Sequence, residues 1–487
     1  MMPQKNIHCE ILIVGSGPGG ATTACLLARA GKDVLLVEEG GHFSVADAAA
    51  YSLKEMDLKY RHAGMTVAFG KPTVAYLEAC CVGGASEVNA GLYHYPFAEV
   101  LENWQAGFQI KEFGLRELEP FFRDGEQDIA VTKMPAGVGP ASRKILEGAD
   151  QLNWKAAEVP RCWKYLKEPS GKTKQVRQSM TETMIPKAIQ AGCRLLARTK
   201  VRYLKLNRRA ALFAVADSFN SDGQKVRLKI FFKNVFVCAG AIQTPALLRR
   251  SGIKRHIGDS LRMHPAIRVV ALFKDQMHDN TEGVPVVQIQ EFKPRLTLGG
   301  SYSALPHLAL WLSGQRDVGK KLSLWKNMAI FYALIVGTGK GTVRNIPFLE
   351  DPWIAMPLTE KDRSAFGDGL FRLGQLLLAA GATEIYSPIA GGPSIKNRAD
   401  LGSLKQVLPQ SGVDISTIHL FSSCPMGEDF KQCAVDSFGK VHGFDNVYLN
   451  DASILSGAPG ANPQALIMAV ARRNAQKFLE NEPTGSL

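Results

Sequence analysis

A glycine turn at residues 15–20 constrains this chain more than any other stretch. The apolar run before it, residues 11–14, is typical of a buried strand, and a helical pattern follows the turn. A second short strand, residues 34–37, ends at the acid Glu38. A strand, a glycine turn, a helix, a strand and an acid in this order predict a unit that binds a dinucleotide. The G-x-G-x-x-G spacing is carried by Gly15, Gly17 and Gly20.

Each residue of the turn has a physical role in such a unit. Gly15 permits the tight turn, Gly17 lets backbone N–H groups approach a pyrophosphate, and Gly20 lets the helix pack closely against the strand. Pro18 and Gly19 begin the helix, whose positive N-terminus attracts phosphate groups. We therefore expect all five residues to contribute to the nucleotide site.

Glu38 narrows the choice of nucleotide. A carboxylate at the tip of the second strand can accept hydrogen bonds from the ribose hydroxyls and disfavours a 2′-phosphate, which argues against NADP. The pattern alone leaves NAD and FAD open. A purely structural turn in an α/β sheet is the alternative.

The charge of the chain favours an anionic partner without predicting nucleic acid. Its 487 residues include 58 Lys and Arg against 45 Asp and Glu, a formal net charge of +13. The basic residues are scattered, so a cofactor phosphate or an acidic surface fits better than a nucleic-acid tail. A solvated basic surface is the simpler alternative.

Cysteine spacing and hydropathy indicate a cytoplasmic protein. Nine cysteines, an odd number with no C-x-x-C pair, predict reduced thiols and neither a disulfide framework nor a metal site. The polar N-terminus lacks the apolar core of a secretion signal. No apolar run approaches the ~20 residues that span a bilayer. Basic and aromatic neighbours of the apolar run 328–336 leave peripheral membrane contact open: Lys320, Lys321, Trp325 and Lys326.

A second glycine pair supplies further polar groups. Gly83 and Gly84 expose backbone N–H groups. Ser86 and Asn89 follow three residues apart, on one side of a helical turn if one forms there. A glycine turn with a capping serine is the alternative.

The middle of the chain alternates between β and helical patterns. The Lys-, Gly- and Pro-rich stretch 160–174 is typical of a loop, and residues 220–223, Asn-Ser-Asp-Gly, are typical of a hairpin turn. Residues 235–245 repeat the order of buried strand, glycine turn and helix, which indicates a return to the nucleotide-binding sheet. An amphipathic helix is expected over 362–380.

The stretch 419–473 is the most informative. His419 stands five residues before Cys424, Asp451 lies in an Asn-Asp-Ala-Ser run, and Asn462 and Pro463 precede a helix. At this point the sequence resembles the glucose–methanol–choline (GMC) family of flavoprotein oxidoreductases.

The resemblance covers nearly the whole chain, because four motifs occur in the family's order. They are the turn 15–20 with Glu38, then 83–89, 238–245 and 419–463. Together they imply FAD as the cofactor. The cofactor-binding residues so implied are Gly15, Gly17, Pro18, Gly19, Gly20, Glu38, Gly83, Gly84, Ser86, Asn89, Val201, Asp451 and Pro463.

Individual positions take their expected roles from the same resemblance. His419 falls at the family's catalytic histidine, and Asn462 falls where members carry a second histidine or an asparagine. Asn89 falls beside the flavin ring, and Val201 matches, over a short stretch, a valine whose backbone meets the adenine. Val88 replaces the histidine that binds FAD covalently in some members, so we expect non-covalent FAD.

The chemistry of these side chains agrees with an alcohol oxidation. Histidine titrates near neutrality and can take a hydroxyl proton as a hydride leaves the neighbouring carbon. Asparagine cannot titrate, but it can donate a hydrogen bond to the alcohol oxygen. We therefore predict His419 as the base and Asn462 as the group that positions the oxygen, with Pro463 stiffening the backbone.

The expected fold is α/β, with a Rossmann-like FAD-binding domain built from discontinuous segments. We assign 5–95, 192–262 and 428–487 to that domain. The remaining segments, 96–191 and 263–427, are expected to form a substrate domain with an antiparallel sheet and helices.

The expected function is the FAD-dependent oxidation of an alcohol to an aldehyde or ketone. The Asn-Pro-Gln sequence at 462–464 resembles members acting on sterols, choline and long-chain alcohols, which favours a fairly apolar alcohol. The electron acceptor, whether oxygen, a quinone or a redox protein, is not predicted. A GMC-fold lyase or decarboxylase is the first alternative. A non-catalytic protein that uses the fold as a scaffold, like the GDP-dissociation inhibitors, is the second.

Overall fold

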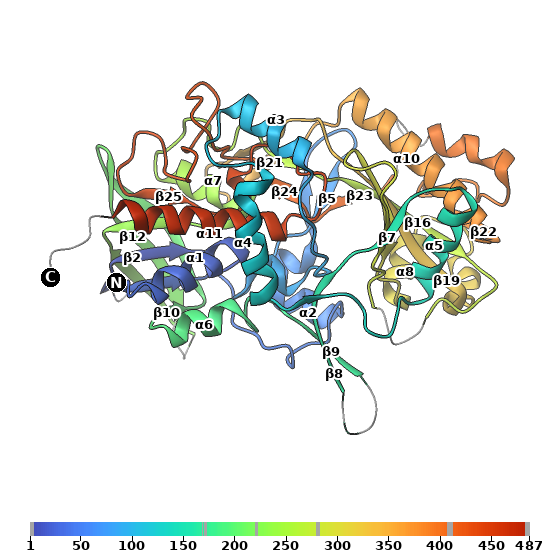
Figure 1. Ribbon diagram of the computed structural model, residues 1–487, viewed down its shortest axis with the longest axis horizontal. Helices are drawn as coiled ribbons and strands as arrows, with labels where there is room; N and C mark the ends of the chain where they lie inside the picture. Colours follow the sequence, from blue (N-terminus) through green and yellow to red (C-terminus); the bar gives the residue numbers. More distant parts are fainter. Residues whose placement is uncertain are drawn as a thin grey trace.

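The computed structural model describes residues 4–167, 169, 173–219, 223–278, 283–406 and 413–482. The chain forms two halves, each around its own apolar core. The half that carries the glycine turn lies on the left of Figure 1, and the half built around β16 and β19 lies on the right. Helices α11 and α1 pack side by side in the first half.

A parallel sheet of five strands organises the first half. Its order is β10-β3-β2-β14-β25, and every pair in it is parallel. The strands are short and their central members are buried, because helices cover the sheet and leave little polar surface. Their bounds are β2 (Ile11–Val14), β3 (Val34–Val37), β10 (Arg194–Leu196), β14 (Asn234–Val237) and β25 (Val447–Leu449).

A smaller four-stranded sheet adjoins it, in the order β1-β13-β12-β11. The expected hairpin turn connects β12 and β13, which pair antiparallel, but residues 220–222 lie outside the described residues. The strands are β1 (Gln4–His8), β11 (Thr199–Asn207), β12 (Ala210–Phe219) and β13 (Lys225–Phe231).

The second half is built on a large, mainly antiparallel sheet. The order of its main path is β4-β5-β23-β16-β19-β18-β17-β7, and β22 pairs with β16 beside that path. The strands are β4 (Thr66–Ala68), β5 (Val74–Tyr76), β7 (Ala156–Glu158), β16 (Ala266–Leu272), β17 (Val287–Ile289), β18 (Leu296–Ser301), β19 (Met328–Ile335), β22 (Glu384–Tyr386) and β23 (Ile415–Thr417).

The long helix α10 (Glu360–Ala379) covers one face of this sheet. A capping box between Thr359 and Asp362 begins it. Its apolar stripe, Phe366 to Leu377 at helical spacing, is buried as the pattern predicts. Gly369 lets α10 approach the sheet, since a Cβ there would lie 2.9 Å from Leu296 and 3.2 Å from Ala333.

The prediction of a loop at 160–174 is wrong. Strands β8 (Arg161–Lys167) and β9 (Thr173–Arg177) pair there and project as a hairpin at the bottom of Figure 1. The guanidinium groups of Arg161 and Arg177 lie over the ring of Trp163, 5.0 and 5.5 Å from its centroid. Such contacts outweigh local composition, because strand stability depends on which side chains pack together.

The remaining helices and short strands complete the two halves. The helices are α1 (Pro18–Arg29), α2 (Leu53–Lys59), α3 (Ala98–Phe108), α4 (Leu115–Asp128), α5 (Pro140–Gln151), α6 (Met184–Gln190), α7 (Gly240–Arg250), α8 (Leu305–Leu312), α9 (Val318–Leu322) and α11 (Gln464–Asn481). The short strands are β6 (Val131–Thr132), β15 (Arg262–Met263), β20 (Thr342–Arg344), β21 (Trp353–Ala355) and β24 (Leu420–Phe421). Among the described residues, no helix is both long and apolar enough to cross a membrane.

Candidate active site

One cavity collects residues from all four motifs. Its empty volume is about 1640 Å³, including the solvent at its mouth. Val14 of β2 and Gln464 at the start of α11 both line it, so the fold brings together residues from near the two ends of the sequence. The predicted site residues in its lining are Gly15, Gly17, Pro18, Gly19, Glu38, Gly84, Asn89, Val201, His419, Asp451, Asn462 and Pro463.

The glycines of the first turn differ in what surrounds them. Gly15 has φ +99°, and a Cβ there would lie 2.4 Å from the carbonyl oxygen of Cys238. A Cβ on Gly20 would lie 1.9 Å from the carbonyl oxygen of Gly15, so helix packing requires this glycine. Gly17 is open: the nearest atom to its Cβ position is the Cα of Gly84 at 3.9 Å. Gly17 therefore keeps space free in the cavity, as the approach of a pyrophosphate requires.

Three predicted residues support the cavity without lining it. Gly20 packs as just described. The Gly83 N–H donates to Ser16 Oγ at 3.0 Å, which ties the second glycine pair to the first turn. Ser86 is buried; its hydroxyl donates to the Gly83 carbonyl at 2.7 Å and accepts from Met180 N at 2.9 Å. Ser86 thus holds the loop that carries Gly84 and Asn89.

Asp451 fixes the start of α7 beside the cavity. Its Oδ2 accepts hydrogen bonds from Gly240 N at 2.7 Å and Thr244 Oγ1 at 2.6 Å. Its Oδ1 accepts from Ser453 N at 2.7 Å. Burial raises the pKa of Asp451, although these donors oppose the shift. The carboxylate therefore joins the C-terminal segment to the glycine turn at 238–240.

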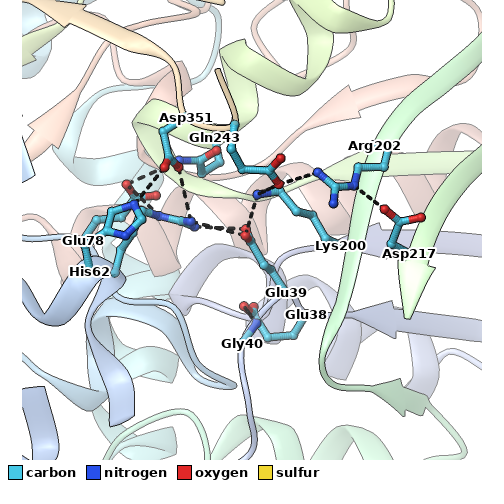
Figure 2. A network of polar contacts seen from close by, with 12 residues as sticks. Glu38, Glu39, Gly40, His62, Glu78, Lys200, Arg202, Asp217, Gln243 and Asp351 are labelled. Atoms are coloured by element: carbon cyan, nitrogen blue, oxygen red, sulfur yellow. Dashed lines mark hydrogen bonds and ion pairs between the residues drawn. The ribbon is translucent and has the colours of Figure 1, made fainter. Parts of the chain in front are cut away.

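A network of polar side chains lies beside Glu38, as Figure 2 shows, and Glu38 itself lines the cavity. The Glu38 Oε2 accepts from the N–H and hydroxyl of Ser16, at 3.0 and 2.7 Å, and its Oε1 accepts from Gly40 N at 3.0 Å. Burial raises the pKa of Glu38. Oε2 already accepts two hydrogen bonds, whereas Oε1 accepts one and retains a lone pair that could accept from a ribose hydroxyl.

Glu39, the residue after Glu38, forms ion pairs beside it. No role for Glu39 was predicted from the sequence. Arg61 pairs with Glu39 at 3.0 Å and with Glu78 at 3.3 Å, and Lys200 pairs with Glu39 at 2.7 Å. Burial alone would raise the pKa of Glu39, but the two cations outweigh it and hold the pKa at about 2. These residues, together with Val201, surround the place expected for an adenosine.

His419 and Asn462 meet at the other end of the cavity. Nε2 of His419 lies 3.5 Å from the Asn462 side-chain nitrogen, although the two residues are far apart in the sequence. His419 is buried, and burial lowers its pKa to about 4, with a smaller contribution from the charge of Arg268. Histidine 419 is therefore neutral at physiological pH. Asn89 reaches the same region, since its Nδ2 donates to Gln464 Oε1 at 2.6 Å.

A second histidine, His264, orients His419. The two Nδ1 atoms are 3.3 Å apart, and both rings are buried. The Gly460 N–H donates to Nε2 of His264 at 3.1 Å, so a neutral His264 carries its proton on Nδ1. His264 then donates to Nδ1 of His419, and neutral His419 holds its own proton on Nε2. Sequence spacing gave no signal for this pair, because the contact joins two connections far apart in the chain, one directly after β15 and one directly before β24.

The described residues hold no cluster of three His, Cys, Asp or Glu side chains that could bind a metal ion. All nine cysteines are free, and burial raises the pKa of Cys424, nearest in sequence to His419. The thiol is therefore protonated and a packing group. The residues that line the cavity therefore fit a dinucleotide site that also contains a histidine–asparagine pair.

Fold and site together define a dinucleotide-binding oxidoreductase of the α/β class. The family model for GMC oxidoreductases matches at residues 35–266 and, for its C-terminal part, at 348–471. The chain belongs to the GMC oxidoreductase family, whose members bind FAD. This finding confirms the resemblance and the fold class predicted from the sequence.

Individual relatives agree with this assignment. The uncharacterised GMC-type oxidoreductase y4nJ of Sinorhizobium fredii is 35% identical, over 98% of this chain and 96% of that one. The long-chain-alcohol oxidase FAO4B of Arabidopsis thaliana is 25% identical, over 98% of this chain and 68% of its own. The crystal structure of pyridoxine 4-oxidase from Mesorbium loti matches with a TM-score of 0.75 at 18% identity, covering 98% of this chain and all of that one (100%).

The cavity fits the cofactor of the family. The open space at Gly17 suits a pyrophosphate, the carboxylate of Glu38 suits ribose hydroxyls, and the helix α1 begins where its dipole favours phosphates. Asn89 and His419 line the same cavity and would be available to contact the flavin ring.

Proposed function

We propose that the protein oxidises an alcohol to an aldehyde or ketone, with FAD as the electron acceptor in the reaction. The observation that carries this proposal is the pair of His419 Nε2 and the Asn462 amide, 3.5 Å apart in the cavity that also contains the glycine turn. The resemblance to alcohol oxidases in sequence supports it.

The two side chains have complementary tasks. When bound, FAD supplies the chemistry of accepting a hydride from the carbon that bears the hydroxyl. His419 takes the hydroxyl proton at Nε2, and the Asn462 amide donates to the oxygen and stabilises its developing charge. Asn89, held by Gln464, and Pro463 beside Asn462 keep this end of the cavity in place.

The proton position on His419 sets a condition for this step. Nε2 must be free to accept, so the proton of neutral His419 has to lie on Nδ1 and be donated to His264. His264 then carries its proton on Nε2 and gives up its contact with Gly460. Leaving the buried Gly460 N–H without its acceptor costs ~1–3 kcal/mol, a small energy beside the barrier that an enzyme lowers. The Nδ1 proton of His264 therefore passes to Nδ1 of His419, while His419 Nε2 releases its proton to solvent and His264 Nε2 takes one from solvent, before the hydroxyl proton is taken.

We further propose that FAD is held without a covalent bond, because residue 88 is a valine. Val88 and Asn89 both line the cavity, and the valine side chain offers no nucleophile. Denaturation in acid should release all the flavin into the supernatant. Flavin retained by the precipitated chain would contradict non-covalent binding.

The deciding experiment is anaerobic mixing of the flavin-loaded protein with a broad panel of alcohols. Bleaching of the flavin absorbance by at least one alcohol, and formation of the matching carbonyl compound, is the expected result. The His419→Ala variant should retain FAD and bleach ~10²–10⁴-fold more slowly. A flavin-loaded protein that no alcohol reduces would refute the proposal and favour lyase or decarboxylase chemistry. Admission of air afterwards tests whether oxygen is the final acceptor.

A further inference from the structure

A row of polar side chains crosses the large sheet on one face. The strand register pairs Arg268 of β16 with Tyr332 of β19, Tyr332 with Gly299 of β18, and Gly299 with Gln288 of β17. Residues that pair directly share a face of the sheet. Gln288 Nε2 donates to Tyr332 OH at 2.9 Å, in agreement with that placement. Helix α10 covers the opposite face, where Ala333 lies.

Two cations belong to this row and its edge. Lys293 lies between β17 and β18, and its Nζ donates to Gln288 Oε1 at 2.8 Å. His94 Nε2 lies 3.0 Å from the same oxygen and 3.4 Å from the lysine nitrogen. Burial lowers the pKa of His94 to about 3, so this ring is neutral. The positive charge therefore belongs to Lys293 and Arg268.

Among the described residues, only neutral groups bind Arg268. Its Nε donates to Ser301 Oγ at 3.1 Å, its Nη1 donates to Ser416 Oγ, and its guanidinium lies 5.0 Å from the ring centroid of Trp311. Within the described part of the chain, Nη2 has no hydrogen-bond partner. One edge of the guanidinium is thus free to bind a ligand.

Neither cation has a carboxylate partner within 4.0 Å among the described residues. Two other buried arginines are paired with carboxylates: Arg61 with Glu39 and Glu78, and Arg472 with Asp128. Buried Arg473 has no carboxylate within 4.0 Å among the described residues, but it donates to the backbone carbonyls of Glu112 and Ser437. Burial lowers the pKa of Lys293 to about 8 and that of Arg268 to about 10. Arg268 and Lys293 are half-buried, so their charges lose part of their hydration, and an anion that binds between them offsets this loss.

The cations lie at the reaction end of the molecule. Ser416, the partner of Arg268, is three residues from His419 in the strand segment that leads to it. Pro294, next to Lys293, packs on Gly460, where a Cβ would lie 2.7 Å from the Pro294 Cβ. Gly460 in turn binds His264. The apolar side chains of Leu92, Ile418 and Leu420 line the cavity in the same region.

We propose that Arg268 and Lys293 bind an anionic group at one end of the substrate while His419 and Asn462 hold its hydroxyl. The substrate class is an alcohol with an apolar body and a negatively charged end, of which a carboxylate is the simplest case. This inference rests on the proposed alcohol oxidation. It keeps the apolar body expected from the sequence and adds the charge that the sequence did not indicate. The reaction at the hydroxyl is unchanged, and the charged end takes no part in it.

The test compares ω-hydroxycarboxylates of increasing chain length with their primary amides, which have the same length and no charge. Anaerobic reduction of the flavin-loaded protein gives a rate and an apparent Kd for each compound. The matching carboxylates without a hydroxyl are titrated separately, and perturbation of the flavin spectrum reports their binding without chemistry. We expect one chain length at which the carboxylate binds at least tenfold more tightly than its amide.

Three variants assign the effect to the cations. Arg268→Gln and Lys293→Gln should each bring the Kd of the carboxylate to within about threefold of the amide, and Arg268→Lys should restore part of the difference. Arg262→Gln is the matched control, because the Arg262 guanidinium donates to the backbone carbonyls of Thr338 and Gly339 in the loop after β19. It should keep the preference. Flavin content and thermal unfolding verify that each variant is folded, and the two glutamine variants test the inference independently.

The outcomes separate the inference from the proposed function. Alcohols that reduce the flavin with no preference for the carboxylate, or a preference that survives both glutamine variants, would overturn the anion site. Carboxylates that bind in an Arg268-dependent way, in a protein that no alcohol reduces, would support the anion site and refute the alcohol oxidation.

Discussion

Replacing Gly17 by alanine should separate cofactor binding from folding. The position has φ −64° and ψ −175°, which alanine adopts without strain, and the nearest protein atom to the new Cβ is 3.9 Å away. The apoprotein should therefore be as stable as the natural one, or more stable by ~0.4–1 kcal/mol because the unfolded chain is less flexible. The methyl group would instead project into the cavity where the pyrophosphate approaches.

The expected loss is in FAD affinity. Overfilling a close-packed site costs ~1–3 kcal/mol, and each 1.4 kcal/mol is a tenfold change in Kd, so we expect the Kd to rise ~10–100-fold. Titration of the apoprotein with FAD, followed by quenching of flavin fluorescence, measures this change directly. Denaturant unfolding of the same apoprotein measures stability.

Gly20→Ala is the matched control from the same turn. Its Cβ would lie 1.9 Å from the Gly15 carbonyl oxygen, so α1 must move away from β2. The expected destabilisation, ~1–3 kcal/mol or more, exceeds the ~1 kcal/mol that alanine contributes to a helix. The reasoning is refuted if Gly17→Ala binds FAD as the natural protein does. It is refuted equally if that variant destabilises the apoprotein as much as Gly20→Ala.

Three further predictions concern the reaction end and its supports. The rate of flavin reduction by an uncharged alcohol should stay level as the pH falls from about 7 to about 5 and should decline below about 4. The reason is that neutral His419 is the base, and its lowered pKa means that it becomes protonated only at low pH. A decline centred near the ordinary histidine pKa, ~6.5, would show that burial does not lower the pKa of His419. His264→Phe should lower stability by ~1–3 kcal/mol, as measured by denaturant unfolding, since the Gly460 N–H loses its acceptor. The same variant should change the flavin reduction rate less than tenfold, and a loss as large as that of His419→Ala would identify His264 as the proton acceptor. Asp451→Ala leaves three donors unpaired, so it should reduce the flavin content and lower the free energy of unfolding by ~2–4 kcal/mol. An unchanged free energy of unfolding would show that Asp451 does not anchor the start of α7.

The local sequence pattern was enough to predict those elements that are stabilised by contacts between residues close together in the chain. The glycine turn, the helix after it and the stripe of α10 follow from backbone freedom and periodicity, which a sequence displays directly. The four motifs also indicated which stretches converge on one cavity. The hairpin β8–β9 was missed because its stability comes from Arg161 and Arg177 stacking on Trp163, and composition does not show which side chains meet.

The polar residues that contact or lie near the candidate site could not be predicted from the sequence either, because the sequence does not show which side chains meet. His264 contacts His419 through the pairing of β15 with β24, which brings residues 262–263 beside 420–421. Arg268 and Lys293 resemble the other scattered basic residues until the register of the large sheet is known. That neither has an acidic partner among the described residues depends on which residues are neighbours in three dimensions, and the spacing of residues along the chain does not show this. The domain boundaries expected from the sequence stay a prediction.

The sheet that holds the glycine turn can be completed only late in translation, because its strands are far apart in the sequence. β14 ends at Val237 and its outer neighbour β25 begins at Val447, so at ~5–20 residues per second a ribosome needs about 10–40 s to make the about 210 residues between them. During that time the edge of β14 has no strand to pair with, and an unpaired edge is a template for pairing with other chains. Asp451, Asn462 and α11 emerge later still. The cofactor site therefore closes only after translation of nearly the whole described chain, which makes flavin loading a post-translational step and exposes the nascent protein to aggregation until then.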